Sequence, residues 1–489
     1  MCVAARASCR RTVLTDLTLA HALASLGCGV ALVTKRQVCW YGSMWFAAAC
    51  GSSTADPMAS GSASAGETGV TGSPGTDGTT GGEGTGASAS ASASASASAG
   101  STGAADESDA GDPPVGFDVA NQPDAPGLGP CADGKGGGGM GPDFSYLWAA
   151  NSGQGTISKI DTETVTEIGR YIVRPDSAGS PSRTSVSSSG NVAVANRSGG
   201  VTKVYARLED CEESNGTPGI QTSDGNAALP WGEEECIAWH TPFAYQSQRP
   251  VAWVRGVLDP VTCELNNEYL WTSGMSGGQI DVLLLDGETG AVIEQTPVAG
   301  LIADSYGLYG GAVDAEGNFW ATQLGSANRL VRIDIDDLSS QVWMPPSGPW
   351  WYGMTVDSEG YVWMCGDSVA RFDPMTEMFT TAAVNGYTGC MAEQGEDGLL
   401  WMSSFSGGAG VIGVNRETLA VEAQWPTPDA YGVSIDFYGY VWTVNNSGAH
   451  RVDPATGEVT SYNGLVGAYT YSDMTGYALT YAGGGTPSG

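Results

Sequence analysis

The stretch Tyr352-Gly353-Met354-Thr355-Val356-Asp357-Ser358-Glu359-Gly360-Tyr361-Val362-Trp363 is repeated along this chain. A near copy runs from Tyr431 to Trp442, 79 residues later, and looser copies end at Trp320 and Trp401. Each copy predicts a short apolar strand, a tight Asp-x-x-Gly turn and a second strand that ends in a Trp. The Trp residues that close these units are Trp271, Trp320, Trp363, Trp401 and Trp442. They are 49, 43, 38 and 41 residues apart, a spacing typical of four-stranded propeller blades.

Seven such units can be counted, and they centre on Trp148, residues 192–196, Trp271, Trp320, Trp363, Trp401 and Trp442. After the last unit, Tyr471 to Leu479 repeats the first-strand pattern with no blade to follow it. A closed ring needs such a strand, because it joins the two ends of the ring and leaves no open sheet edge. We therefore predict an all-β, seven-bladed β-propeller of four-stranded blades at 144–489. Residues near Asp473 to Leu479 should form the innermost strand of the blade that contains Trp148.

A second recurrent unit places a Thr three residues after an Asp, at Asp161, Asp286, Asp373 and Asp453. Asp and Thr side chains hydrogen-bond to the backbone of tight turns, so each unit predicts a hairpin between the third and fourth strands of a blade. Because the same Asp recurs from blade to blade, we interpret it as structural rather than catalytic.

The first 50 residues carry two export-like patterns. Residues 17–34 have no formal charge, and a second apolar run at 38–49 follows Lys35-Arg36 and precedes Cys50. The second pattern resembles a bacterial lipoprotein signal peptide, which implies cleavage before Cys50 and lipid attachment to it. It has Ala47 where that signal usually has Leu. Plain secretion with cleavage nearby is the alternative, and the doubled leader suggests that the start is assigned too far upstream.

Residues 51–143 consist mainly of Gly, Ser, Ala, Thr, Asp and Pro. Such a segment cannot bury enough apolar surface to offset the entropy of ordering it, so we predict a disordered linker. With a lipid on Cys50 it would tether the propeller to a membrane. The expected location is the bacterial cell envelope, as an outer-membrane-anchored lipoprotein, or the periplasm or exterior.

The formal net charge is -33, from 20 Lys plus Arg against 53 Asp plus Glu. Such a field repels nucleic acid, so we expect no nucleic-acid partner. We expect a monomer. The sequence holds no G-x-S-x-G, Walker or H-E-x-x-H motif, and no cofactor is predicted from it.

One insertion, at about 206–249, interrupts the repeat. It contains Cys211 and Cys236, which we predict to form a disulfide, while the pairing of the other cysteines stays open. Long loops on a rigid scaffold often bind ligands, which makes Trp231 and Trp239 candidates. Within the insertion, the oxygen-bearing side chains of Glu213, Asn215 and Thr217 alternate as in a calcium loop, although Pro218 stands where Gly usually makes the turn. A disulfide-stapled, solvated loop is the alternative.

A Tyr-Gly pair opens several blades, at Tyr309, Tyr352 and Tyr431, and Tyr387 is related to them. This pattern predicts Tyr at the start of an innermost strand, near one mouth of the central channel. Phenols there could bind a sugar or a peptide. Alternatively, Tyr fills a wide channel mouth and Gly lets neighbouring strands approach closely.

Together, the Tyr-Gly pair, the Asp-x-x-Gly turn, the closing Trp and the Asp-x-x-Thr-Gly hairpin resemble the virginiamycin B lyase-like and NHL-like seven-bladed propellers, over roughly Phe144 to Leu479. The resemblance implies the fold, and for the lyases of that group it implies a His and a Glu on one face. The candidates here are His240, His450 and Glu235. A His pair is hard to assemble from them, so we predict a binding module for a peptide, glycan or protein. A lyase-like enzyme is the alternative.

Overall fold

The computed structural model describes residues 144–481, except 260, 263–264, 348 and 396–397. The predicted leader at 1–50, the lipid site at Cys50 and the predicted linker at 51–143 lie outside the described residues. No helix among the residues that are described is long and apolar enough to span a membrane.

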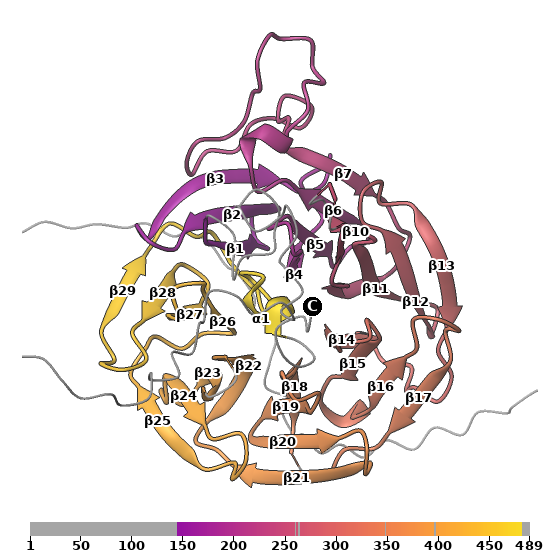
Figure 1. Ribbon diagram of the computed structural model, residues 1–489, viewed down its shortest axis with the longest axis vertical. Helices are drawn as coiled ribbons and strands as arrows, with labels where there is room; N and C mark the ends of the chain where they lie inside the picture. The colour runs from indigo at the N-terminus through magenta and orange to yellow at the C-terminus, as the bar shows by residue number, and fades with distance from the viewer. Residues whose placement is uncertain (1–143, 260, 263–264, 348, 396–397, 482–489) are drawn as a thin grey trace, which may run out of the picture. The chain divides into compact units, whose positions relative to one another are not determined.

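The described chain forms seven antiparallel sheets arranged in a ring, which confirms the seven-bladed propeller (Figure 1). The first sheet has three strands, β1 (Tyr146–Asn151), β2 (Thr156–Asp161) and β3 (Thr166–Ile172). The other six have four strands each. From innermost to outermost, the second blade contains β4 (Pro181–Val186), β5 (Val192–Asn196), β6 (Val201–Val204) and β7 (Ile237–Thr241), and the third contains β8 (Ser247–Trp253), β11 (Tyr269–Ser276), β12 (Gln279–Asp286) and β13 (Val292–Pro297). The fourth contains β14 (Leu308–Val313), β15 (Phe319–Gln323), β16 (Leu330–Ile333) and β17 (Ser340–Trp343), and the fifth contains β18 (Trp351–Val356), β19 (Val362–Gly366), β20 (Ser368–Asp373) and β21 (Met378–Ala383). The sixth contains β22 (Tyr387–Glu393), β23 (Leu400–Ser406), β24 (Val411–Val414) and β25 (Val421–Trp425), and the seventh contains β26 (Gly432–Ile435), β27 (Val441–Val444), β28 (Ala449–Val452) and β29 (Val459–Tyr462).

The C-terminal segment closes the ring at the blade of Trp148. In the third to seventh blades the recurrent Trp lies on the second strand. By analogy β1, which carries Trp148, is also a second strand, and the place inside it is left for another segment. The backbone N–H of Trp148 donates to the carbonyl of Met474 (2.9 Å), and that of Tyr469 donates to the carbonyl of Ala150 (3.0 Å). The predicted closure is therefore confirmed, with two corrections. Within the described residues the closing segment is not a regular strand, and its one β-bridge joins Tyr471 to Arg183 of β4. Residues Tyr477–Tyr481 form a short helix, α1, so the closing segment begins and ends earlier than Asp473 to Leu479.

The Asp of the Asp-x-x-Gly turn anchors the Trp six residues later. The carboxylate of Asp357 accepts hydrogen bonds from the backbone N–H groups of Glu359 and Tyr361 and from Nε1 of Trp363 (2.7 Å). Asp436 binds Trp442 in the same way (2.7 Å), and Asp314 binds Trp320 (2.8 Å). The repeat therefore encodes a buried Asp–indole pair that fixes the turn to the strand that follows it.

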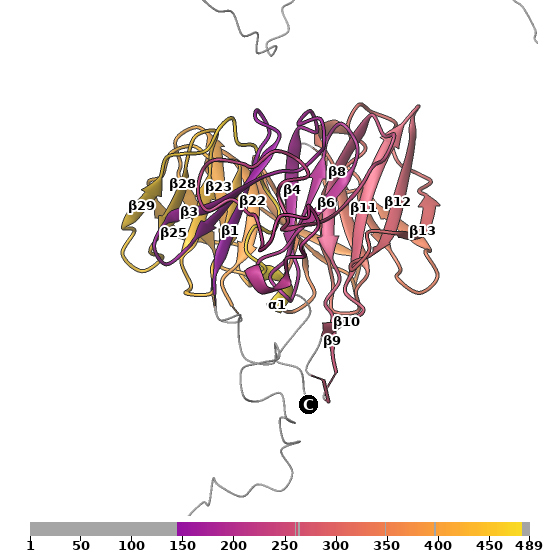
Figure 2. The same cartoon turned by 90° about the horizontal axis from the view of Figure 1, so that it is seen from above.

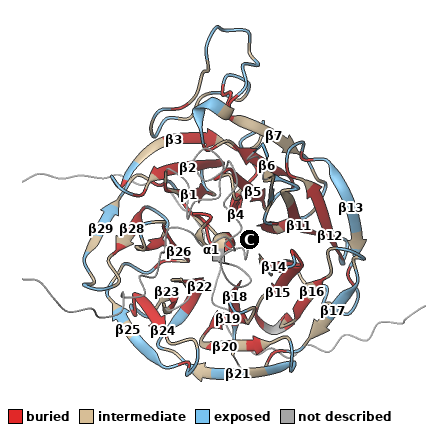
Figure 3. Cartoon of the chain, in the orientation of Figure 1, coloured by how far each residue is buried: buried red, intermediate tan, exposed pale blue. Residues whose placement is uncertain are grey.

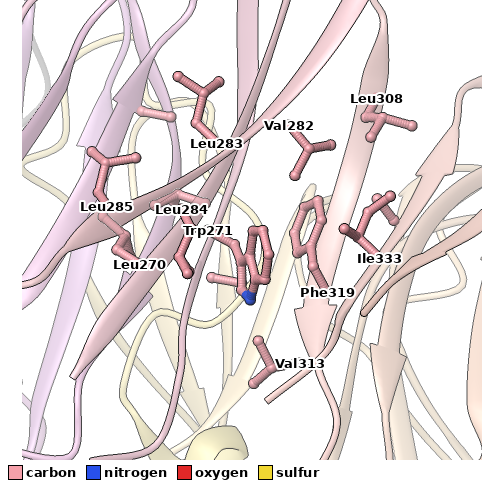
Figure 4. Packing of buried hydrophobic residues seen from close by; sticks show 14 of the residues in the cluster. Leu270, Trp271, Val282, Leu283, Leu284, Leu285, Leu308, Val313, Phe319 and Ile333 are labelled. Atoms are coloured by element: carbon pink, nitrogen blue, oxygen red, sulfur yellow. The ribbon is translucent and has the colours of Figure 1, made fainter. Parts of the chain in front are cut away.

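Each of these Trp residues packs in the core. Between the third and fourth blades, the rings of Trp271 and Phe319 stack with centroids 5.8 Å apart, and Val282, Leu284 and Ile333 lie beside them (Figure 4). The outermost strands β13, β21 and β25 are largely exposed, while the inner strands are buried (Figure 3). The predicted third-to-fourth-strand hairpins are also present. The carboxylate of Asp286, for example, accepts from the backbone N–H of Thr289 (2.8 Å).

The insertion is shorter than predicted and lies inside a blade. It connects β6 to β7, so Ile237–Thr241 is the outermost strand of the second blade and Ser247–Trp253 is the innermost strand of the third. Its Cys211 and Cys236 form the predicted disulfide.

The innermost strands β4, β8, β14, β18, β22 and β26 all begin at one face of the ring and end at the other. We name the face where they begin the tyrosine face and the opposite one the hairpin face. Helix α1 and the small hairpin of β9 (Val257–Leu258) and β10 (Leu265–Asn266) both lie on the hairpin face (Figure 2).

Candidate ligand-binding site

The structure brings the four predicted tyrosines into one aromatic cluster at the tyrosine face. The rings of Tyr309 and Tyr352 lie 5.4 Å apart, and Phe405 links Tyr352 (5.0 Å) to Tyr431 (5.8 Å) and to Tyr387 (6.0 Å). Each of the four tyrosines comes from a different blade, at or just before the start of its innermost strand. Their convergence follows from the ring geometry, because equivalent positions of neighbouring blades meet around the axis.

The closing segment adds two tyrosines that the sequence analysis did not include. Tyr469 packs against Tyr431 with ring centroids 4.9 Å apart, and its hydroxyl lies 2.7 Å from that of Tyr309. The hydroxyls of Tyr352 and Tyr471 also bind that of Tyr469. Burial raises the pKa values of Tyr352 and Tyr469 well above the ordinary range, so these phenols stay neutral and serve as hydrogen-bond donors and acceptors.

The cluster has a buried floor and an exposed rim. Tyr309, Tyr352 and Tyr471 are buried, which agrees with the interpretation that they fill the channel mouth. Tyr387 is 46% exposed, and Tyr306, whose ring contacts that of Tyr309, is 41% exposed. Only the rim is therefore accessible to a ligand.

Irregularities in the innermost strands direct some of these side chains. Tyr309 and Tyr352 are the extra residues of β-bulges, because their neighbours on both sides pair in register with β15 and β19 while they do not. A similar bulge in β8 contains Arg249. Bulges re-aim a side chain, here toward the axis. Gly310 follows Tyr309, and a Cβ atom there would lie 2.9 Å from the side chain of Met354 in the next blade, so Gly allows the close approach.

Three arginines join the tyrosines, and sequence reasoning missed all of them. Arg183 is fully buried, donates from Nε to the carbonyl of Tyr309 (3.0 Å) and stacks over the ring of Tyr309. Arg249 also stacks over the ring of Tyr309, with its Cζ atom 4.9 Å from the ring centroid. Arg197 lies over the ring of Tyr469 at 5.1 Å. A signal existed, since Arg183 and Arg249 stand near the starts of β4 and β8, where Tyr309 and Tyr352 stand in β14 and β18.

A hollow of about 720 Å³ lies between the fourth and fifth blades and is lined by residues that include Asp314, Trp343, Glu359 and Asp373. A smaller cavity lies at the channel mouth of the hairpin face. It has a volume of about 50 Å³ and is lined by the ends of innermost strands, by α1 and by Glu393 and Asp473. This space is enough for a few water molecules. Burial raises the pKa of Glu393 to about 7, although the carboxylate contacts Arg416 (2.5 Å) and accepts from the hydroxyl of Ser358 (2.6 Å). These contacts join neighbouring blades, so we interpret the group as structural.

The structure does not bring together the candidate acid/base residues. His240 lies on β7 and His450 on β28, in different blades. Nδ1 of His240 lies 2.9 Å from the hydroxyl of Thr202, and Nδ1 of His450 lies 2.8 Å from that of Ser461. The carboxylate of Glu235 instead accepts hydrogen bonds from backbone N–H groups of the insertion, which lower its pKa. Among the described residues, no contact joins the three.

The remaining candidates lie in or beside the insertion, away from the tyrosine cluster. Trp239 donates to the carbonyl of Gly287 (3.1 Å), and the ring of Trp231 contacts that of His240. In the predicted calcium loop, Glu213 accepts from the backbone N–H of Gly219 (3.2 Å), and Asn215 accepts from that of Thr217 (2.8 Å). Within the described part of the chain, no group of three or more His, Cys, Asp or Glu could hold a metal ion.

No family model and no curated protein matches the sequence. Among solved structures, a streptogramin B lyase is 14% identical, with 61% of this chain and 86% of the lyase covered and a TM-score of 0.44. A catalytically inactive virginiamycin B lyase from Staphylococcus aureus, solved with quinupristin, is 13% identical (66% and 89% covered, TM-score 0.40). A candidate 6-phosphogluconolactonase from Bacteroides fragilis is 15% identical (67% and 97% covered, TM-score 0.46). The chain is distantly similar to these lyase and lactonase propellers, and the similarity is one of fold alone.

Proposed function

We propose that this protein is an exported, lipid-anchored binding module of the cell envelope, and that its ligand binds to the rim of the tyrosine face. The ligand is a peptide, glycan or protein segment. Cys50 carries the lipid, residues 51–143 act as the tether, and the propeller works as a monomer.

The single observation that carries the binding role is the convergence of aromatic side chains at one mouth of the channel. The buried floor of phenols is held by hydrogen bonds around Tyr469, so the exposed rings of Tyr387 and Tyr306 sit on a rigid support. Aromatic rings present large contact area at a low cost in side-chain entropy, which suits sugars and peptides alike. A binding role is favoured over catalysis because the candidate acid/base groups have separate partners.

The test of binding uses the full chain on peptide and glycan arrays. Tyr387→Ala combined with Tyr306→Ala should remove the signal of any ligand that binds at the rim. Tyr438→Ala is the matched control, because Tyr438 is also an exposed tyrosine (53%) but follows Asp436 in a turn on the hairpin face. Equal loss in both variants, or no loss in either, would argue against binding at the rim.

The test of the anchor is the mass of the mature protein recovered from membranes. A chain that starts at Cys50 and carries diacylglycerol is expected, and Cys50→Ser should release the protein from the membrane fraction. A mature chain that still contains residues 17–34 would contradict both the anchor and the proposed upstream error in the start.

A further inference from the structure

The tyrosine face concentrates positive charge in an acidic protein. Arg183, Arg197 and Arg249 come from the innermost strand of the second blade, the end of its β5 and the innermost strand of the third blade. Each lies over a ring of the tyrosine cluster. Among the described residues, the ion pairs involve other basic side chains, and none of these three has a carboxylate partner.

Arg183 is a buried cation that the protein itself does not satisfy. Its side chain is fully buried, and both Nη1 and Nη2 lack a hydrogen-bond partner. Buried charges in proteins are normally paired, because the loss of hydration is costly. Burial lowers the pKa of Arg183 to about 10, with Arg249 adding repulsion. Stacking on aromatic rings recovers only part of this cost.

Arg197 and Arg249 lie at the solvent-facing edge of the cluster and keep donors free. Both are half-buried. Arg197 uses Nε and Nη2 on Ser180, and Arg249 uses Nε on the hydroxyl of Ser247. Burial, and then repulsion from Arg249, lower the pKa of Arg197. Two guanidinium groups that repel one another, and that form no ion pair within the described part of the chain, favour an anion near both.

The overall negative charge of the chain does not cancel this local field. At about 0.1 M salt, charges farther away than roughly 10 Å are largely screened. The titratable groups that act on Arg183 are the phenols of Tyr309, Tyr352 and Tyr469 and the guanidinium of Arg249, and no carboxylate is among them. An anion at the rim is therefore attracted by its immediate surroundings.

We propose that the rim of the tyrosine face binds the oxyanion group of its ligand, a carboxylate or a phosphate, through Arg197 and Arg249, with Arg183 supplying charge from below. Guanidinium groups match these planar or tetrahedral oxyanions with paired N–H donors. The exposed aromatic rings then contact the rest of the ligand. This inference deepens the proposed binding function and rests on it.

The experiment measures binding of inorganic phosphate and of acetate, separately, to the full chain by calorimetry and by chemical shifts of Arg side chains in a chloride buffer. Wild-type protein should bind at least one of them at millimolar concentration. Arg249→Gln and Arg197→Gln should each weaken binding on the order of ten- to a hundredfold, as expected for the loss of a charge-assisted hydrogen bond. Binding of phosphate alone would assign the ligand to phosphates, and binding of both would extend it to carboxylates.

The matched control is Arg255→Gln. Arg255 is exposed and follows β8, so this variant removes the same charge from the same blade at the hairpin face and should bind phosphate like the wild type. Equal weakening by Arg255→Gln would mean that only the general field matters and would overturn the proposal. No binding of either anion by the wild type would also overturn it. The two failures can be told apart. If only the oxyanion proposal is wrong, the protein still binds an array ligand that lacks a carboxylate or phosphate, and this binding still depends on Tyr387 and Tyr306.

Discussion

The unpaired charge of Arg183 makes an unusual prediction about stability. Replacing a buried, well-packed side chain normally destabilises a protein, but Arg183→Met should not. Met is unbranched and fills a similar volume, and it removes a charge that has no counterion among the described residues. The pKa of Arg183 is lowered from 12.5 to about 10 by burial. A shift of that size corresponds to about 3 kcal/mol of disfavoured charge in the folded state.

Two losses oppose this gain. The variant gives up the hydrogen bond from Nε to the carbonyl of Tyr309, worth about 1 kcal/mol, and stacking on the tyrosine rings, worth about 0.5 to 2 kcal/mol. The expected result is a free energy of unfolding between unchanged and about 2 kcal/mol higher. In the same variant, binding of phosphate should weaken.

The assay is urea denaturation of the full chain in a chloride buffer without phosphate. Arg170→Met serves as the control, because Arg170 is as deeply buried but pairs with the buried carboxylate of Glu167 (2.7 Å). That variant leaves an unpaired buried charge and should lose about 3 to 5 kcal/mol. If Arg183→Met loses as much as Arg170→Met, the guanidinium of Arg183 is a structural element, and the reasoning that it awaits an anion is refuted.

Three further predictions concern the scaffold. Trp363→Ala should lower the free energy of unfolding by about 3 to 5 kcal/mol, and an unchanged urea midpoint in this variant would contradict the packing. Trp363→Phe should lower it by about 1 to 3 kcal/mol, because Phe keeps an aromatic ring but leaves the buried Asp357 without its indole donor. Burial lowers the pKa of Lys159 from 10.5 to about 8, so between these values the unfolded chain binds more protons than the folded one and stability should rise with pH. Lys159→Met should flatten that rise, and parallel wild-type and variant profiles between these pH values would disprove the assignment. Replacing Cys211 and Cys236 together by Ser should cost about 3 to 4 kcal/mol from loop entropy, since the disulfide joins residues 25 apart; a reductant should destabilise the wild type but not the variant, and equal sensitivity of both would speak against the bridge.

The fold could be predicted from the sequence because its repeat is made of residues with strong local preferences. The Asp-x-x-Gly turn fixes where a strand reverses, and the Trp six residues after the Asp marks the second strand of the blade. These signals are local, so the fourth, fifth and seventh blades each carry them independently of their neighbours. The orphan first-strand pattern after the last blade then required ring closure.

The errors lie where tertiary context overrides the local pattern. The outermost strand Ile237–Thr241 follows the insertion after β6, and no turn motif marks its start, so the local pattern does not separate it from the insertion. At the C-terminus, the closing segment donates and accepts single backbone hydrogen bonds with β1 without forming a regular strand, and Tyr477–Tyr481 forms a short helix on the hairpin face. Pairing with β1 decides where the closing segment ends, and the sequence does not state the register.

The arginine cluster escaped prediction for a different reason. The Tyr-Gly repeat identifies the channel mouth in the later blades, but the second and third blades place Arg183 and Arg249 there without that motif. From the sequence alone, an Arg in an acidic chain is expected to lie on the surface. Only the ring geometry shows that these side chains meet Tyr309 from two neighbouring blades.

Ring closure and formation of the candidate site depend on the same residue, Tyr469. Its backbone N–H binds Ala150 in the first blade, its ring packs on Tyr431 beside the last blade, and its hydroxyl meets those of Tyr309 and Tyr352 in the fourth and fifth. Because Tyr469 belongs to the closing segment, the phenol floor cannot form until the ring is closed. An open ring would lack the support for its aromatic rim, and Arg183 would lose the cover of Tyr471. The binding surface is therefore a property of the closed ring and not of any single blade.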